Sequence, residues 1–141
     1  MFNELEFWKL CFLIDYFVKI RELIRKSMSK PVEIDSSIRT VEWKDNKVIM
    51  IEQTKLPNEL IFVEYDDFNQ VANAIKTLIV RGAPAIGVSG AFGLGLAALQ
   101  SKATTKKELL SDLEDARKIL FATRPTAVNL GWGLEKIMNV A

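Results

Sequence analysis

Histidine is absent from this sequence of 141 residues, and cysteine occurs once, as Cys11. Without histidine the chain lacks the commonest transition-metal ligand and the commonest general base, which argues against a zinc site or a histidine-based catalytic triad within it. A single cysteine cannot form an internal disulfide, a pattern typical of a reducing compartment, so we expect a cytoplasmic protein. A lone cysteine on an apolar helix face usually packs, and we assign Cys11 no chemical role.

An excess of charge of either sign is also missing. The 19 Lys and Arg residues nearly balance the 18 Asp and Glu residues, which gives a formal net charge of +1. This balance disfavours nucleic acid as a main partner. Hydrophobic residues make up 49% and charged residues 26%, proportions that suit a folded domain with a buried core and a solvated surface.

The first thirty residues carry apolar side chains at helical spacing from Leu10 to Ile24, which predicts an amphipathic helix. Asp15 and Lys19 interrupt this run well short of the roughly 20 apolar residues that a bilayer crossing requires, so we expect no membrane partner. The start also lacks the positive region of a signal peptide. Two interpretations stay open: an accessory helix over the core, or an upstream segment that is not made because translation begins at Met28.

Residues 39–65 have the pattern of strands. Residues 39–43 alternate between apolar and polar, residues 44–47 are turn formers, and residues 48–51 and 60–65 are rich in β-branched and aromatic side chains. The pattern predicts a small three-stranded antiparallel sheet. We expect Trp43 to pack in the core rather than to contact a ligand.

Helical patterns fill the rest of the chain. Asp67 is an expected N-cap with Gln70 as its capping-box partner, and an apolar stripe then continues to Arg81. The segment from Pro84 to about Gln100 is rich in glycine and alanine, which predicts a buried helix that neighbouring backbones approach closely.

A second capping box, Thr105 with Glu108, predicts the start of a third helix, which Pro125 ends. Thr126 is the expected cap of the last helix, whose Trp132, Leu134 and Ile137 we expect to expose an apolar face. The predicted fold is therefore α+β: an N-terminal extension over residues 1–34, then one domain over residues 35–141 with a three-stranded sheet followed by a helical bundle.

The segment RGAPAIG, residues 81–87, lies between two predicted helices. Gly82 permits unusual backbone angles, Pro84 suits the first turn of a helix, and Arg81 adds a permanent positive charge. Free N–H groups at a helix start and a guanidinium together predict a phosphate-binding site. The alternative interpretation is an ordinary turn between two helices.

A second segment, TRPTAVNL at residues 123–130, again places an arginine before a proline at a helix start. Because a residue before proline is pushed out of the helical region, Arg124 should lie in an extended connection and turn toward Arg81. Asn129 could also reach the ligand, although asparagine in this position often bonds locally.

These two segments, with RTVEW, VANAIKTLIV and a closing W-x-L in the same order, resemble the N-terminal part of the S-methyl-5-thioribose-1-phosphate isomerase family of methionine salvage. That family is related to regulatory subunits of the eukaryotic initiation-factor exchange complex. The resemblance runs from about Arg39 to the end of the sequence. Family members are about twice as long and continue into a second, Rossmann-like domain that holds the catalytic cysteine and aspartate.

The resemblance implies a substrate-binding role for Arg81, Gly82, Ala83 and Arg124, which would hold the phosphate of a sugar phosphate. It implies no catalytic residue, no metal and no cofactor in this chain, which we expect to be inactive alone. The resemblance also implies that the full-length protein forms a homodimer. Two other functions stay open: a ribose 1,5-bisphosphate isomerase, and a regulatory subunit without catalysis.

Overall fold

The structure, a computed structural model, describes residues 38–141. Arg39–Ala141 forms one compact unit. The predicted amphipathic helix, Cys11 and the alternative start at Met28 lie outside the described residues, and the division of the chain near residue 34 stays a prediction.

The sheet contains β1 (Val41–Lys44), β2 (Lys47–Ile51) and β3 (Phe62–Tyr65), which pair antiparallel in the order β1-β2-β3. Asp45 and Asn46 join β1 to β2 with positive φ angles of 51° and 59°. Two residues with positive φ form the turn whose twist matches that of the flanking strands, and Asp and Asn accept these angles more readily than most residues do. The predicted hairpin and the third strand are confirmed.

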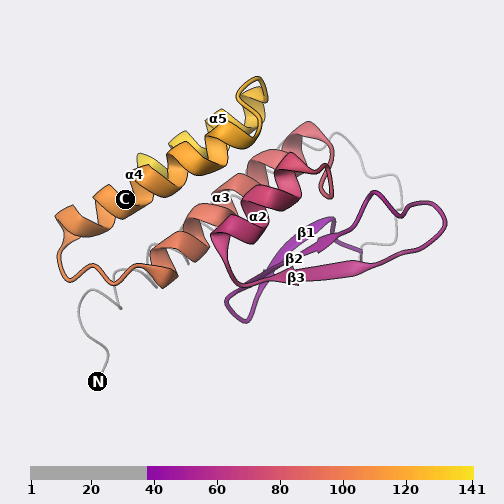
Figure 1. Cartoon of the computed structure of the whole chain (residues 1–141), viewed down its shortest axis with the longest axis horizontal. Helices are drawn as coiled ribbons and strands as arrows, with labels where there is room; N and C mark the ends of the chain where they lie inside the picture. The colour runs from indigo at the N-terminus through magenta and orange to yellow at the C-terminus, as the bar shows by residue number, and fades with distance from the viewer. Residues whose placement is uncertain (1–37) are drawn as a thin grey trace, which may run out of the picture. The chain divides into compact units, whose positions relative to one another are not determined.

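Four helices follow the sheet: α2 (Phe68–Lys76), α3 (Ala83–Gln100), α4 (Lys106–Thr123) and α5 (Val128–Met138). In Figure 1 α3 and α5 run in one direction, while α2 and α4 run in the opposite one. The starts of α3 and α5 therefore lie at the same end of the domain as the ends of α2 and α4. The predicted α+β fold, a small sheet followed by helices, is confirmed.

Helix α3 is the centre of the core. It contacts the other helices and both β1 and β2, and its residues from Gly90 to Ala98 are all buried. Trp43 of β1 is half buried and packs edge-on against Phe92, with ring centroids 5.9 Å apart, which agrees with the packing role predicted for it. By length and composition α3 could cross a membrane, but 67% of it is buried inside the domain, as expected for a core helix.

The end of α2 differs from the prediction. The helix stops at Lys76, because Leu78 adopts a φ of 62° and the chain turns. Asp67 is the N-cap, and its side chain accepts a hydrogen bond from Asn69 N at 2.8 Å. The reciprocal bond predicted from Gln70 is not formed.

Of the two caps predicted for the later helices, one is confirmed and one is wrong. The capping box of Thr105 and Glu108 is confirmed in both directions. The prediction that Thr126 caps α5 is wrong: Ala127 occupies the N-cap position and offers no side-chain bond. The predicted exposed face of α5 is also largely wrong, since Leu134 and Ile137 are buried and only Trp132 is half exposed.

Candidate anion-binding site

Glycine residues allow the backbones of α3 and α5 to come into close contact near the starts of the two helices. A Cβ atom added to Gly87 would stand 2.7 Å from the carbonyl oxygen of Asn129, and one added to Gly133 would stand 2.5 Å from the carbonyl oxygen of Gly87. Only residues without side chains permit such an approach between two helix backbones. The segments 81–87 and 123–130, which lie some forty residues apart in the sequence, are therefore brought together as predicted.

Both helix starts carry N–H groups that no helical hydrogen bond uses. In α3 the first such bond runs from Ile86 N to Gly82 O at 3.0 Å, and in α5 from Leu130 N to Ala127 O at 2.9 Å. The amides of Ala83 and Ala85, and those of Val128 and Asn129, come before these bonds. Two parallel helix starts place the positive ends of two helix dipoles close together, which favours an anion.

Arg81 lies in the turn between α2 and α3. Its Nε donates to the carbonyl oxygen of Leu78 at 3.2 Å, which leaves the two terminal nitrogens without a hydrogen-bond partner among residues 38–141. Gly82 is the N-cap of α3, with φ 87° and ψ 131°, a conformation open to glycine and costly for other residues. Arg81 thus stands directly before the N-cap of α3, and its guanidinium contacts the carbonyl of Leu78 in the same turn.

Arg124 is the C-cap of α4, and its φ of −151° and ψ of 77° lie outside the helical region, as expected before proline, but short of the predicted extended conformation. Its carbonyl oxygen accepts a hydrogen bond from Ala127 N at 3.0 Å, which closes a tight turn into α5. The half-buried side chain makes no hydrogen bond or ion pair with any described residue. Arg124 is therefore a cation without a protein counter-ion in the described part of the chain.

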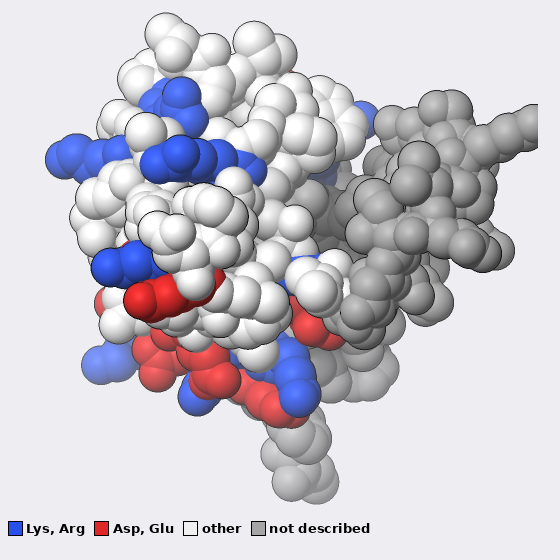
Figure 2. Space-filling view, turned by 90° about the vertical axis from the view of Figure 1, so that its right-hand side faces the viewer, with Lys and Arg blue, Asp and Glu red and all other residues white. Residues whose placement is uncertain are grey.

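Segments 81–87 and 123–130 contain no acidic residue, and neither do the residues that flank them in the sequence. The sequence has no Asp or Glu between Asp67 and Glu108, and none between Asp115 and Glu135. Figure 2 faces the end of the domain at which α3 and α5 begin, and among its charged residues only Lys and Arg appear over the upper part, where the helices lie. Acidic side chains gather lower down, toward the sheet. The local field at the helix starts favours negative charge.

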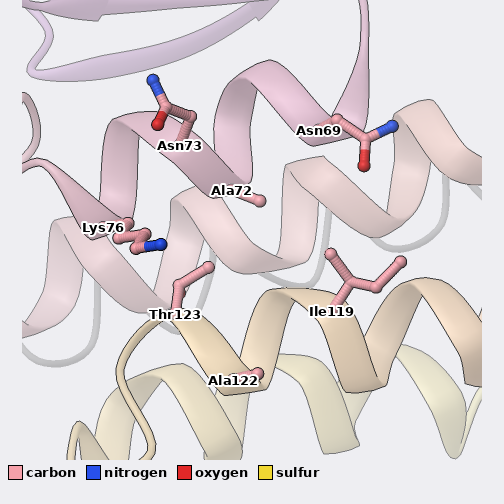
Figure 3. Close-up of a pocket in the computed structure, with 7 residues that line it drawn as sticks. All are labelled: Asn69, Ala72, Asn73, Lys76, Ile119, Ala122 and Thr123. Atoms are coloured by element: carbon pink, nitrogen blue, oxygen red, sulfur yellow. The ribbon is translucent and has the colours of Figure 1, made fainter.

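A shallow groove of about 290 Å³ runs between α2 and α4 near this end. Ala72 and Lys76 from α2, and Ile119 and Thr123 from α4, point toward the space between the helices (Figure 3). Neither Arg81 nor Arg124 lines it. The candidate anion site is therefore a surface at two helix starts and not this groove, to which Lys76 contributes a cation.

The structure places the predicted site residues at two neighbouring helix starts. Arg81, Gly82 and Ala83 lie at the start of α3, and Arg124 lies just before α5, whose start contacts α3. Asn129 is half buried, and its backbone contacts α3. Binding of a ligand by these residues stays a prediction. Among residues 38–141, no group of three His, Cys, Asp or Glu side chains could hold a metal ion.

Sequence reasoning missed two features of the site. The first is that the free amides of Val128 and Asn129 lie at a helix start next to that of α3. This proximity depends on the glycine contact between the two helices. The second is Gln53, whose backbone and side chain both bond to the turn before α3. A glutamine in a loop carries no motif, so no sequence pattern could have identified it.

Residues 79–141 match the model of the initiation factor 2 subunit family. Over 105 residues, 74% of this chain, the sequence is 50% identical to a methylthioribose-1-phosphate isomerase from Geotalea uraniireducens. The predicted resemblance to the N-terminal part of that enzyme is confirmed. The chain spans about 30% of the length of this relative.

Two solved structures are similar in fold. One is a 5-methylthioribose 1-phosphate isomerase from Pyrococcus horikoshii OT3, with a TM-score of 0.71 and 50% identity over 74% of this chain and 30% of that one. The other is described as subunit delta of the translation initiation factor eIF-2B from A. fulgidus, with a TM-score of 0.69 and 44% identity over 73% of this chain and 30% of that one.

Proposed function

We propose that residues 38–141 bind the phosphate of a sugar phosphate, as the N-terminal part of a methylthioribose-1-phosphate isomerase. The observation that carries the proposal is the pair of neighbouring helix starts, at α3 and α5, each preceded by an arginine. The similarity to isomerases at 50% identity supports the choice of substrate class.

A phosphate monoester suits these groups in charge and in shape. It carries about 1.5 to 2 negative charges near pH 7 and three acceptor oxygens. The amides of Ala83 and Val128 and the guanidinium groups of Arg81 and Arg124 supply donors and positive charge. Arginine is the better cation here, because its planar fork can bond two phosphate oxygens at once.

In an aldose–ketose isomerisation of methylthioribose 1-phosphate, a hydrogen moves between C2 and C1 with no external oxidant. The phosphate is bonded to the oxygen on C1, so a fixed phosphate fixes the reacting carbon. Positioning of this kind can supply a large share of a rate enhancement. Arg81 and Arg124 would bind and orient the substrate, and we place no acid or base of the reaction in this chain.

The test is calorimetric titration of the 141-residue chain with 5-methylthioribose 1-phosphate and, separately, with 5-methylthioribose, which lacks the phosphate. We expect binding of the phosphate ester, in the millimolar range because one part of the site acts alone, and no measurable binding of the free sugar. Equal binding of both compounds, or of neither, would contradict the proposal.

The similarity to subunit delta of an initiation factor supports a second candidate, a regulatory subunit that acts through protein surfaces. Such a protein has no need of a phosphate site. Failure of the phosphate ester to bind, in a chain that folds normally, would favour this candidate. A ribose 1,5-bisphosphate isomerase would instead bind its own bisphosphate more tightly than 5-methylthioribose 1-phosphate.

A further inference from the structure

The turn before α3 is attached to the sheet through one residue. Gln53, two residues after β2, donates its backbone N–H to the carbonyl oxygen of Ile79 at 2.9 Å, and its side-chain Nε2 donates to the carbonyl oxygen of Arg81 at 3.3 Å. Both bonds cross more than 25 residues of sequence. The loop after β2 thus holds both sides of the turn that carries Arg81.

This turn has unusual backbone angles. Leu78 has a φ of 62° and Gly82 a φ of 87°, and a leucine in that region is strained. Such a turn keeps one conformation only where its surroundings hold it. The bonds available for this are Ile79 N to Ala74 O at 3.0 Å, Arg81 Nε to Leu78 O at 3.2 Å, and the two from Gln53.

Of the two bonds from Gln53, the side-chain bond is the one that reaches a residue of the candidate anion site. It ends on the carbonyl of Arg81, in the peptide unit that also contains the N–H of Gly82. Rotation of this peptide plane would swing that N–H and displace the guanidinium of Arg81 relative to Ala83. A donor on the carbonyl oxygen opposes that rotation, because turning the peptide would break the bond.

We propose that Gln53 is a positioning residue of the phosphate site, and that its carboxamide sets the orientation of the Arg81–Gly82 peptide. This inference rests on the function proposed above. It assigns Gln53 no contact with the ligand. Gln53 acts through Arg81 and Gly82, which would bind the anion.

The structure offers a matched control at the other end of α3. Gln100 Nε2 donates to the carbonyl oxygen of Asp66, also at 3.3 Å. The same kind of side chain therefore makes the same kind of bond, but it does so at the last residue of α3 and away from the predicted site. Gln53→Met and Gln100→Met each remove one such bond while keeping a side chain of similar length.

The experiment is an NMR titration of the 141-residue chain with inorganic phosphate at constant ionic strength, followed at the amides of Gly82 and Ala83. A typical net hydrogen-bond contribution predicts that Gln53→Met weakens phosphate binding about three- to tenfold. It should also change the shifts of the two amides at saturation. Gln100→Met should leave both unchanged, with melting temperatures of the two variants similar.

Gln53→Glu gives an independent check, since it keeps the side-chain length but replaces the donor by a carboxylate. It should weaken phosphate binding at least as much as Gln53→Met. Unchanged affinity and unchanged amide shifts in both Gln53 variants, when the unsubstituted chain binds phosphate, would overturn the role of Gln53 and leave the proposed function intact. No phosphate binding by the unsubstituted chain would overturn both.

Discussion

Gly133 of α5 lies against the carbonyl oxygen of Gly87 in α3, so closely that a Cβ atom at Gly133 would stand 2.5 Å from it. The contact joins backbone to backbone, and no side chain can move aside to relieve it. The distance between the starts of the two helices therefore depends on a residue that has no side chain.

Gly133→Ala should destabilise the domain, because α3 and α5 must separate to admit the methyl group. Overpacking of this kind costs about 1–3 kcal/mol, and thermal unfolding monitored by circular dichroism would measure it as a lower melting temperature. Gly131→Ala is the control: its Cβ would meet only the partly exposed ring of Phe121, at 3.3 Å. The account is contradicted if Gly133→Ala is no less stable than this control.

Arg124→Ala should weaken binding of a phosphate ester more than tenfold, which corresponds to about 1.4 kcal/mol, while the melting temperature stays nearly unchanged. The reason is that the side chain has no partner among the described residues, so its removal costs the fold little. Lys107→Ala, at the start of α4 and the opposite end of the helices, should leave affinity unchanged. A loss of stability with unchanged affinity would argue for a structural role.

Acid should weaken the start of α4 through Glu108. Hydrogen bonds from the backbone and side chain of Thr104, with smaller contributions from Thr105, lower the pKa of the Glu108 carboxyl. A carboxyl whose folded-state pKa is lowered stabilises the fold fully above its unfolded pKa, and this contribution is lost as the pH falls through the lowered value. Glu108→Gln should therefore be less stable than the unsubstituted chain at pH 7, as judged by urea unfolding. The gap should close in acid, and a gap of constant size from pH 7 to pH 3 would contradict this.

Ser89 is fully buried in α3, and its Oγ has no hydrogen-bond partner among the described residues. A buried hydroxyl without a partner is costly, and alanine is also the better helix former. Ser89→Ala should therefore raise the free energy of unfolding by about 1 kcal/mol, measured by urea denaturation. A clear loss of stability would show that the hydroxyl does have a partner.

The sequence predicted the fold well where local chemistry decides it. The turn at Asp45 and Asn46, the cap at Thr105 and the non-helical backbone of Arg124 all follow from the preferences of single residues or short motifs. The errors arose where contacts distant in sequence decide the outcome. Leu78 fits the apolar stripe of α2, yet α2 ends at Lys76 and Leu78 lies in a turn whose next residue, Ile79, accepts a hydrogen bond from Gln53.

The candidate site was predictable in its residues and not in its geometry. Arg81 and Arg124 stand out beside glycine and proline in short motifs, and their positions at two helix starts follow from that. The prediction of an exposed face on α5 was wrong for Leu134 and Ile137. The glycines of α3 let α5 pack closely against it, and both side chains are buried. Periodicity shows which side of a helix is apolar, but not how deeply that side is buried.

The most direct test of the central claim asks whether the two helix starts bind one anion. In an amide NMR titration of the 141-residue chain with inorganic phosphate, we expect Ala83 at the start of α3 and Val128 at the start of α5 to shift with the same dissociation constant. Arg124→Ala should weaken the response at both positions together. Different constants at the two positions, or a response of Ala83 that Arg124→Ala leaves unchanged, would contradict a single shared site.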